Sequence, residues 1–401
     1  MRLIHTADWH LGQTFYEYDR KAEHALFLTW LIEQVRIHKV DTLLIAGDVF
    51  DTPNPSADAQ RQYYSFLKNI TTQNPDLQII VIAGNHDSAA RLEAPNPLLE
   101  AMNVSVRGLV KRTADGEIDF NDLIIELKNG AYCLAVPYLR QGDYPTANTY
   151  SEGVQAMYKE LFERVGKKNK IIIAMGHLQA TGSEISQNDR AERTIIGGLE
   201  SISPDAFGKE IAYTALGHLH RAQRVSQREN VRYAGAPLPM SFAEKNNKQG
   251  VTLVTITDTT KVERLEFEPP IKLLSIPKEA KVLKDVLAEI ALLPDTKSIE
   301  SHDLTRETFP FVEIKVLIIE PEPSLRVQIE KALEGKAVRL ARIEAKICAS
   351  KSTNKPITYQ ELQKINPIDM ATEIFKRKYG GDSMPEEMRT LLEKVIMEVN
   401  R

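Results

Sequence analysis

The chain has 401 residues, of which 42% are hydrophobic and 26% are charged, and its formal net charge is −4. This length predicts about two or three domains, and the ordinary apolar fraction excludes wholesale disorder. The two cysteines exclude a disulfide framework, and the low net charge excludes a global basic field that would attract nucleic acid.

The N-terminal segment MRLIHTADWHLG predicts no signal peptide, because His5, Asp8 and His10 interrupt its apolar stretch. No apolar run in the sequence approaches the roughly 18 residues that a membrane-spanning helix needs. Two cysteines in a chain of this length fit a reducing compartment. We therefore expect a cytoplasmic protein without a membrane partner.

Over the first 220 residues, short apolar runs alternate with amphipathic helical patterns. Strands are expected at 2–6, 42–46, 78–83, 131–136, 171–175 and 212–216. A helix at 19–38 and a second helix at 56–70, which Ser56 can cap, lie between the first strands. The apolar stripe expected on the first helix consists of Ala25, Leu28, Leu31, Ile32 and Val35. This alternation predicts an α/β core.

After about residue 220 the pattern changes to short strands with turn residues between them. These strands, expected at 222–226, 231–234, 250–257 and 261–267, indicate an antiparallel completion of the core sheet. The sequence Glu268-Pro269-Pro270 then predicts a domain boundary. Residues 271–347 follow the order strand, helix, strand, helix, strand, which predicts a small α/β domain.

The last part of the chain, after a polar linker at 349–355, is expected to be helical. Capping boxes occur at Thr358 and Ser383, and Asn366-Pro367 is a further helix start. The final helix carries an apolar stripe of Met388, Leu391, Leu392, Val395, Ile396 and Val399. This apolar stripe either packs on the chain's own core or binds a partner. The polar linker that precedes it favours a partner.

Five of the predicted strands end in the same way, with an apolar run, a turn and side chains that can bind metal. The five segments are Asp8-Trp9-His10, Gly47-Asp48, Gly84-Asn85-His86-Asp87, Gly176-His177 and Gly217-His218-Leu219-His220. Ligands of α/β folds lie at the carboxyl ends of strands, so these side chains should converge. Oxygen and nitrogen donors without thiolate suit Mn²⁺, Mg²⁺ or Fe²⁺, and their number suits two ions that share a carboxylate.

In order, these segments match the signature D-x-H, G-D, G-N-H-[DE], G-H and G-H-x-H of the calcineurin-like metallophosphoesterases, which the chain therefore resembles. The resemblance implies two metal ions: one held by Asp8, His10 and His220, the other by Asn85, His177 and His218, with Asp48 bridging them. It also implies hydrolysis by a hydroxide bound between two metals, with His86 as the general acid. Asp51 is a second catalytic candidate. It either orients His86 or only supports the loop, and Asp87 has a similar pair of interpretations.

Longer stretches resemble the family of bacterial SbcD nuclease subunits: HTADWHLGQTF, AGDVFDTPNPS, IAGNHDS, GHLHRAQ and VRYAGAPLPMSF. This resemblance implies a metallophosphoesterase β-sandwich core flanked by helices at 1–270, a small α/β capping domain at 271–348, and a linker with a helical tail at 349–401. The chain differs from the archaeal relatives at one position, since they carry a histidine where this chain has Asp51.

The same resemblance implies a Mn²⁺-dependent, ATP-regulated nuclease that acts in DNA replication, recombination and repair. Its activities would be a 3′→5′ exonuclease on duplex ends and an endonuclease on single strands and hairpins. The implied partner is an SbcC-type ATPase that binds residues 356–401, within a heterotetramer that holds two nuclease subunits and associates with the nucleoid. No G-x-x-x-x-G-K-[ST] motif occurs, so ATP must act through the partner.

Several side chains near the motifs are candidates for contacts to DNA phosphates or bases. They are Gln13, Phe15, Tyr16, Lys111, Arg112, Arg221, Arg224, Arg228 and Arg232. The alternative for the basic residues is an ordinary solvated face, whereas Trp9 is expected to pack in the core.

Two rival functions stay open. The first is a phosphomonoesterase or cyclic-nucleotide phosphodiesterase on the same fold, against which the residues beyond 270 argue. The second is a non-catalytic scaffold for an ATPase, against which the intact ligand set argues.

Overall fold

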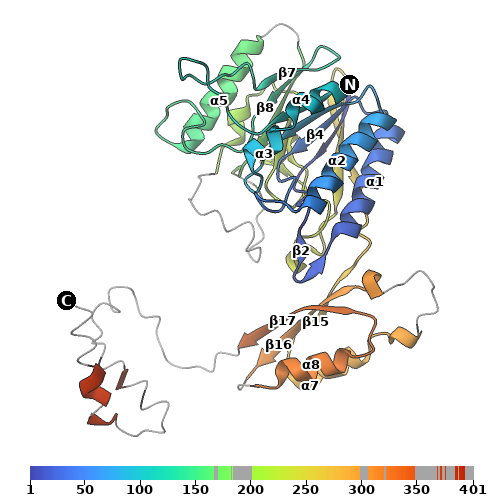
Figure 1. Cartoon of the computed structure of the whole chain (residues 1–401), viewed down its shortest axis with the longest axis vertical. Coiled ribbons are helices and arrows are strands. Elements are labelled where there is room, and N and C mark those ends of the chain that lie inside the picture. The colour runs from blue at the N-terminus through green and yellow to red at the C-terminus, as the bar shows by residue number, and fades with distance from the viewer. Residues whose placement is uncertain are drawn as a thin grey trace. The chain divides into compact units, whose positions relative to one another are not determined.

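The computed structural model describes residues 1–166, 170–181, 183, 201–298, 306–319 and 322–347, and in the tail residues 368, 371, 372, 375, 384–386 and 388–392. The chain divides into two compact units, Met1–Lys346 and Ile347–Arg401. Figure 1 shows the elements of both units.

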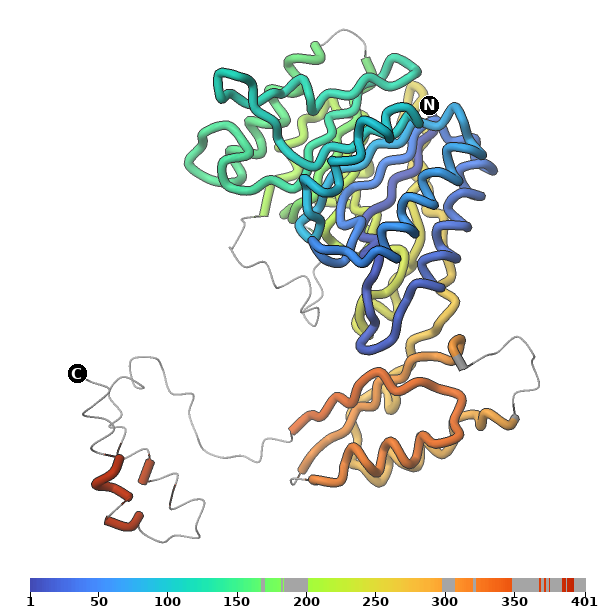
Figure 2. The backbone as a smooth tube through the Cα atoms, in the orientation of Figure 1, coloured from blue at the N-terminus to red at the C-terminus, as the bar shows by residue number. Residues whose placement is uncertain are grey.

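A six-stranded sheet contains the N-terminal strand near its centre. Its order is β14-β13-β1-β4-β5-β6. Four strands run parallel: β1 (Arg2–Thr6), β4 (Thr42–Ala46), β5 (Gln78–Ile82) and β6 (Val104–Arg107). The hairpin of β13 (Gly250–Ile256) and β14 (Thr260–Glu266) adds to β1 in the antiparallel direction. Figure 2 traces this late segment beside the N-terminal strand.

The second six-stranded sheet has the order β11-β12-β10-β9-β8-β7. Its strands are β7 (Ile124–Glu126), β8 (Tyr132–Ala135), β9 (Ile172–His177), β10 (Tyr213–Gly217), β11 (Gln223–Val225) and β12 (Arg228–Tyr233). The strand β12 pairs with β10 in the parallel direction. The expected antiparallel completion of a single core sheet is therefore wrong here, because the late strands divide between two sheets.

The two sheets pack face to face through apolar side chains. One buried cluster joins Leu44 and Ile80 of the first sheet to Ile173, Met175 and Ala215 of the second. Helices cover the outer faces, so that consecutive strand residues are buried on both sides, as the runs IIVIA and KIIIAM predict. The prediction of an α/β sandwich core flanked by helices is confirmed.

The helices α1 (Lys21–His38) and α2 (Ala57–Gln73) cover the first sheet, and α5 (Tyr150–Val165) covers the second (Figure 1). Ser56 caps α2 as predicted, since its hydroxyl accepts the backbone N–H of Ala59 at 3.1 Å. The predicted stripe of α1 is wrong at Ala25, which is exposed. Phe27 is buried instead and packs edge-on against Trp9.

Two short helices, α3 (Ala89–Glu93) and α4 (Asn96–Leu99), follow β5.

Beyond the sandwich, the chain forms a three-stranded sheet of β15 (Leu273–Lys281), β16 (Phe311–Ile318) and β17 (Arg339–Ile347). The helices α7 (Leu283–Ala291) and α8 (Leu325–Leu333) pack on it. Alternate residues of β16, such as Val312 and Ile314, face these helices. We call residues 271–347 the capping domain, and its order of elements is the predicted one.

A small hairpin joins the capping domain to the core. Its strands are β2 (Thr14–Phe15) and β3 (Tyr18–Asp19). The ring of Phe15 lies 5.0 Å from that of Phe311 in β16, and the Tyr18 hydroxyl donates to the carbonyl of Leu340 at 3.0 Å. The core therefore contacts the capping domain through the segment that directly follows His10.

Little of the tail falls among the described residues. The helix starts predicted at Thr358, Asn366 and Ser383 lie outside them, as do Val395, Ile396 and Val399. Met388 and Leu391 belong to a helical segment and are exposed. Within the described part of the chain, no helix combines the length and the apolar character that crossing a membrane requires.

Candidate metal centre

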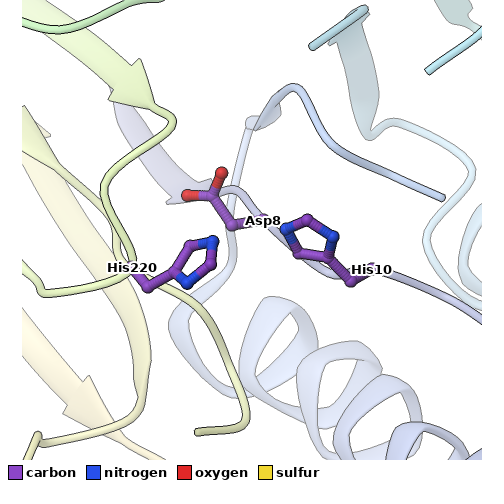
Figure 3. A group of neighbouring side chains, drawn as sticks. All are labelled: Asp8, His10 and His220. Carbon is purple, nitrogen blue, oxygen red and sulfur yellow. The ribbon is translucent and has the colours of Figure 1, made fainter. Parts of the chain in front are cut away.

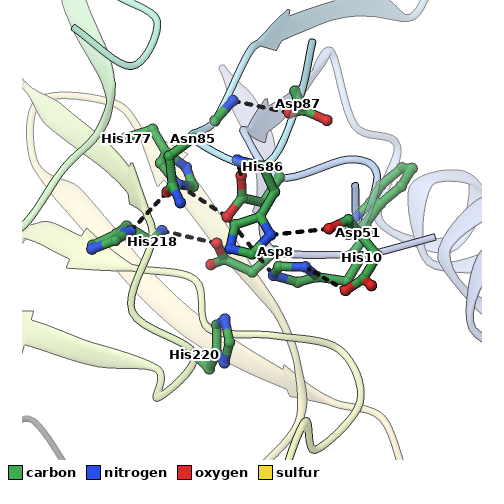
Figure 4. Close-up of polar contacts among 12 residues, drawn as sticks. Asp8, His10, Asp51, Asn85, His86, Asp87, His177, His218 and His220 are labelled. Atoms are coloured by element: carbon green, nitrogen blue, oxygen red, sulfur yellow. Dashed lines mark hydrogen bonds and ion pairs between the residues drawn. The ribbon is translucent and has the colours of Figure 1, made fainter. Parts of the chain in front are cut away.

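The predicted site residues lie at one edge of the sandwich, where β1, β4 and β5 of the first sheet and β9 and β10 of the second sheet end. Hydrogen bonds connect the loops that follow these strands. The N–H of His10 donates to the carbonyl of Asp48, and the N–H of His218 donates to Asp8 Oδ1 at 2.9 Å. These bonds hold the loops of both sheets together (Figure 4).

Two overlapping groups of buried side chains can each hold a metal ion. The first is Asp8, His10 and His220, and the second is Asp8, Asp48 and His177. In each group the ligand atoms lie within 4.8 Å of one another. Figure 3 shows the first group, in which His220 approaches Asp8 and His10 from a separate loop.

The other two predicted ligands complete the second group. Asn85 Oδ1 lies 2.9 Å from His177 Nε2 and 3.0 Å from His218 Nδ1. Asp48 Oδ2 lies 3.2 Å from His177 Nε2 and 3.8 Å from His10 Nε2, so this oxygen lies between the two groups. The structure thus brings all seven predicted ligands together.

Two buried atoms of the centre indicate that a cation fits there. Asp8 Oδ2 and His10 Nε2 have no hydrogen-bond partner among the residues that the structure describes. A buried polar atom without a partner costs about 1–3 kcal/mol, and a divalent cation would satisfy a carboxylate oxygen and an imidazole nitrogen together.

The electrostatics of the site also favour a cation. Burial raises the pKa of Asp8 and lowers the pKa of His218 to about 3. Burial alone would lower the pKa of His177 as well, but the adjacent charge of Asp48 raises it to about 9. Without a metal, a proton on His177 therefore balances Asp48, and a bound cation would take over this role.

The backbone is strained at several of the predicted ligands. Positive φ angles of 55°, 48° and 49° occur at Asp8, His10 and Asp48, and φ is 102° at His218. Non-glycine residues in such conformations cost about 1–3 kcal/mol each and persist where the surroundings fix them. This strain directs four side chains from three loops, those after β1, β4 and β10, toward one point.

Two glycines allow the loops to approach this closely. A Cβ atom on Gly47 would lie 2.3 Å from His177 Nδ1, and one on Gly84 would lie 2.1 Å from Asp48 Oδ1. Real contacts of this kind are never so short, so any side chain here would push the two groups of ligands apart.

Three histidines of the centre are oriented by a contact from the ring nitrogen that faces away from it. His177 Nδ1 donates to the carbonyl of Ala46 at 2.9 Å. His220 Nδ1 forms a hydrogen bond with Glu244 Oε1 at 3.2 Å, whereas His10 Nδ1 lies 3.2 Å from Asp51 Oδ1 as a close charged contact without hydrogen-bond geometry. Such partners fix the tautomer and the ring orientation of metal-binding histidines. The sequence analysis did not identify Glu244. The one feature that could have indicated it is its position two residues after the VRYAGAPLPMSF stretch, which ends at Phe242.

His86 lies beside the ligands and is half-buried. Its N–H donates to Asp48 Oδ1 at 2.8 Å, and its ring lies 4.9 Å from that of His10. Its Nδ1 lies 3.0 Å from the carbonyl oxygen of Asp51, which can only accept, so Nδ1 carries the hydrogen. The Asp51 carbonyl thus orients His86, while the Asp51 carboxylate contacts His10.

Asp87 supports the loops instead of joining the ligands. Its carboxylate accepts the backbone N–H groups of Val49, Phe50 and Gly84 at 3.2, 2.9 and 2.9 Å. It thereby ties the loop after β4 to the loop after β5. The structural interpretation of Asp87 is the one that these bonds favour.

The candidate DNA contacts near the N-terminus have different surroundings. Gln13 follows His10 closely, and its side-chain oxygen accepts from the buried guanidinium of Arg20 at 3.2 Å. Tyr16 is partly exposed beside Phe242. Phe15 does not face substrate as expected, because it is buried against Phe242 and Phe311. Trp9 packs in the core as predicted.

The basic candidates already have partners within the chain. Lys111 forms ion pairs with Glu93 and Asp122, and the guanidinium of Arg112 donates to the carbonyls of Gly116 and Gly142. Arg224 and Arg232 share Glu229. Arg228 donates to the carbonyls of Pro204 and Gly208. Arg221 is exposed one residue after His220.

Comparisons with known proteins agree with the motifs. The family model of the calcineurin-like phosphoesterases matches residues 1–222, and that of the type 5 capsule protein repressor C-terminal domain matches residues 269–379. The chain is 37% identical to a Rhodobacter capsulatus protein, over 85% of this chain and 86% of that protein. It is 30% identical to an Escherichia coli K12 protein, over 99% and 97% of the two chains, and 32% identical to a Bacillus subtilis protein, over 63% and 66%. All three are named as the SbcD component of the nuclease SbcCD.

Replacing Gly84 by alanine should abolish metal binding, because the new Cβ would collide with Asp48. We expect less than one Mn²⁺ per chain in Gly84→Ala, measured by elemental analysis at concentrations that load the wild type with two. Gly130→Ala is the control, because a Cβ there would meet nothing within 4 Å, although the positive φ of 79° at Gly130 strains an alanine. A Gly84→Ala protein with full metal content would contradict this account of the site.

Removing the Asp51 carboxylate should weaken metal binding by about 10–100-fold, because His10 loses the group that orients it. Asp51→Asn keeps an oxygen acceptor and should retain most of the affinity. Titration calorimetry with Mn²⁺ measures both variants, with the exposed Asp58→Ala as control. If Asp51→Ala binds Mn²⁺ as tightly as the wild type, the Asp51 carboxylate does not orient His10.

Proposed function

The chain belongs to the calcineurin-like phosphoesterases and, within them, to the SbcD family of metal-dependent nuclease subunits, and we propose that it cleaves phosphodiester bonds of DNA at the centre formed by its five strand ends. The observation that carries this proposal is the position of Asp48 between two groups of ligands, with His86 beside them. Two ions that share a carboxylate are the arrangement expected for phosphoryl transfer between oxygens.

Each predicted ligand has a place in this proposal. One ion would be held by Asp8, His10 and His220. The other ion would be held by Asn85, His177 and His218, and Asp48 would bind both ions. When bound, two such ions supply a water of lowered pKa and polarise the phosphoryl oxygens. The set of oxygen and nitrogen donors supports Mn²⁺, with Mg²⁺ or Fe²⁺ as alternatives.

His86 is proposed to donate the proton that the leaving oxygen of the sugar needs. Because Nδ1 is used by the Asp51 carbonyl, Nε2 is the ring nitrogen left for this transfer. Asp51 is a positioning residue in this scheme, acting on His86 through its carbonyl and on His10 through its carboxylate. Glu244 has the same role toward His220.

The proposed activities are 3′→5′ digestion of duplex ends and cleavage of single strands and hairpins, regulated by ATP through an SbcC-type ATPase. Residues 356–401 would bind this partner, and two nuclease subunits would share the complex, associated with the nucleoid in the cytoplasm. The names of the relatives and the matched C-terminal family model support this part of the proposal. The exposure of Met388 and Leu391 supports the tail as the docking segment.

A macromolecular substrate is favoured over a small phosphate ester by the capping domain. This domain contacts the hairpin that directly follows His10, through Phe15 and Tyr18. A small ester needs no such addition beside the metal centre. The domain boundaries at 270 and 348 belong to the proposal.

Hairpin DNA should be cleaved in the presence of Mn²⁺, and p-nitrophenyl phosphate should be a poor substrate. The measurement is the initial rate on an end-labelled hairpin duplex and on the small ester at equal enzyme concentration, with a chelated sample as blank. Activity on the ester alone would contradict the nuclease proposal, and a chain that binds no Mn²⁺ would support the scaffold. The same assay with a reconstituted SbcC-type ATPase, with and without ATP, tests the regulation.

Replacing His86 by glutamine should slow DNA cleavage by about 10²–10⁴-fold, the usual contribution of a general acid. Bis(p-nitrophenyl) phosphate should lose far less rate, because p-nitrophenolate leaves without a proton. The variant should keep two Mn²⁺ per chain, since His86 is not among the ligands. His38→Gln is the control outside the centre. Equal losses on both substrates, or loss of metal, would refute the role of His86 as an acid.

A further inference from the structure

The loop that follows β8 carries two side chains that the metal centre does not use. β8 pairs with β9 in the parallel direction, so both strands end at the edge of the sandwich where the ligands lie. Three residues beyond the end of β8 is Tyr138, and Arg140 follows it in an exposed position. We call residues 136–143 the β8 loop. It begins beside the strand that ends in the predicted ligand His177.

Tyr138 contacts a predicted ligand of the second ion. The centre of its ring lies 6.3 Å from that of His177, and the two rings are inclined by 78° in an edge-on arrangement. The backbone N–H of Tyr138 donates to the carbonyl of Ala83 at 2.9 Å, just before Asn85 in the chain. Figure 4 shows His177 and Asn85 beside each other. The β8 loop is thus tied to the second group of ligands from both sheets.

The guanidinium of Arg140 lies over the ring of Tyr138, with its carbon 5.7 Å from the ring centre. Arg140 is exposed, and its guanidinium forms no hydrogen bond or ion pair with any residue that the structure describes. A guanidinium presents five N–H donors in a planar fork that matches two oxygens of a phosphate. A cation that can still accept an anion therefore lies one ring away from the metal centre.

The backbone of the β8 loop is held in place. Leu139 is buried in the core behind the second sheet. The carboxylate of Asp143 accepts the backbone N–H of Arg140 at 2.8 Å, and the N–H of Asp143 donates to the carbonyl of Arg140 at 3.0 Å. Arg112 donates to the carbonyl of Gly142. The acidic group of this turn thus binds the backbone, while the guanidinium of Arg140 stays free of it.

The two groups of ligands have different neighbours along the edge. His10 of the first group precedes the hairpin that contacts the capping domain, whereas His177 of the second group contacts Tyr138. Asp48 Oδ2 lies between these two histidines. A strand that is bound across both ions therefore meets the β8 loop next to the second one. A continuous strand has a further phosphate to offer there, and a small phosphate ester has none.

We propose that Arg140 binds the DNA phosphate next to the one that is cleaved, beside the second ion, and that the ring of Tyr138 holds its guanidinium in place. This inference rests on the proposed nuclease function and deepens it, because it names a contact that a continuous strand makes and a small ester lacks. Contacts to phosphates fix the position of nucleic acid without reading its sequence, and they make the affinity depend on salt.

The test uses Arg140→Gln, which removes the charge and keeps a long polar side chain. Arg164→Gln is the matched control, because Arg164 is also exposed and its guanidinium lies over a ring, 4.8 Å from the centre of Phe120. Both variants are assayed with Mn²⁺ on a hairpin duplex and on bis(p-nitrophenyl) phosphate, a diester without a neighbouring phosphate. Binding of the hairpin is measured in EDTA over a range of salt concentrations. Melting temperature and Mn²⁺ content confirm that each variant is folded.

In Arg140→Gln, we expect kcat/KM on the hairpin to fall about tenfold relative to kcat/KM on the small diester. The salt slope of hairpin binding should fall by about one, the effect of one lost phosphate contact. Arg164→Gln should match the wild type. Equal results for the two variants, or an equal loss on both substrates, would overturn the proposal. A wild type that cleaves the small diester and not DNA is a failure of the nuclease proposal instead.

Two variants of Tyr138 test the part of the ring. Tyr138→Leu removes the ring below the guanidinium and should lower the ratio of the two kcat/KM values about threefold, the usual size of an exposed contact between a cation and a ring. Tyr138→Phe keeps the ring and should restore the ratio. An equal fall in both Tyr138 variants would overturn the role assigned to the ring.

Discussion

Asp48 uses its two carboxylate oxygens for different parts of the molecule. One accepts the backbone N–H of His86, and the other lies between His177 and His10. It therefore connects the loops after β4 and β5 in the first sheet to β9 in the second. The contact requires the two sheets to meet within van der Waals distance at this edge, where Gly47 and Gly84 leave no room for a side chain. The strained ligands, the buried carboxylates and the orienting partners are all arranged around it.

Much of the centre could be predicted from the sequence because its signals are local. Each ligand follows a strand within a few residues, and the strand itself is a short apolar run. The carboxyl ends of parallel strands share an edge, so five local patterns predict one site. The cap at Ser56 and the burial of Trp9 could be predicted for the same reason, since neighbouring residues decide them.

Other features depend on contacts between distant segments and were missed. The sequence around β12 does not indicate that this strand pairs with β10 in the parallel direction. That pairing depends on how the late strands are distributed between the two sheets. Phe15 lies in a loop with polar neighbours in the sequence, and its burial depends on two distant residues, Phe242 and Phe311. Glu244 reaches His220 from a turn 24 residues later. Ala25 was expected inside because its spacing fits, but larger Phe27 fills the space against Trp9.

The hairpin of β2 and β3 has a mechanical consequence. It begins a few residues after His10 and ends at Arg20, which is buried and held by Glu23, Gln13 and the carbonyl of Pro239. Its tip is fixed to the capping domain through Phe15. The hairpin, fixed at Arg20 and at Phe15, thus connects the capping domain to the loop that carries the two ligands Asp8 and His10. A displacement of that domain would therefore act first on the loop that carries Asp8 and His10.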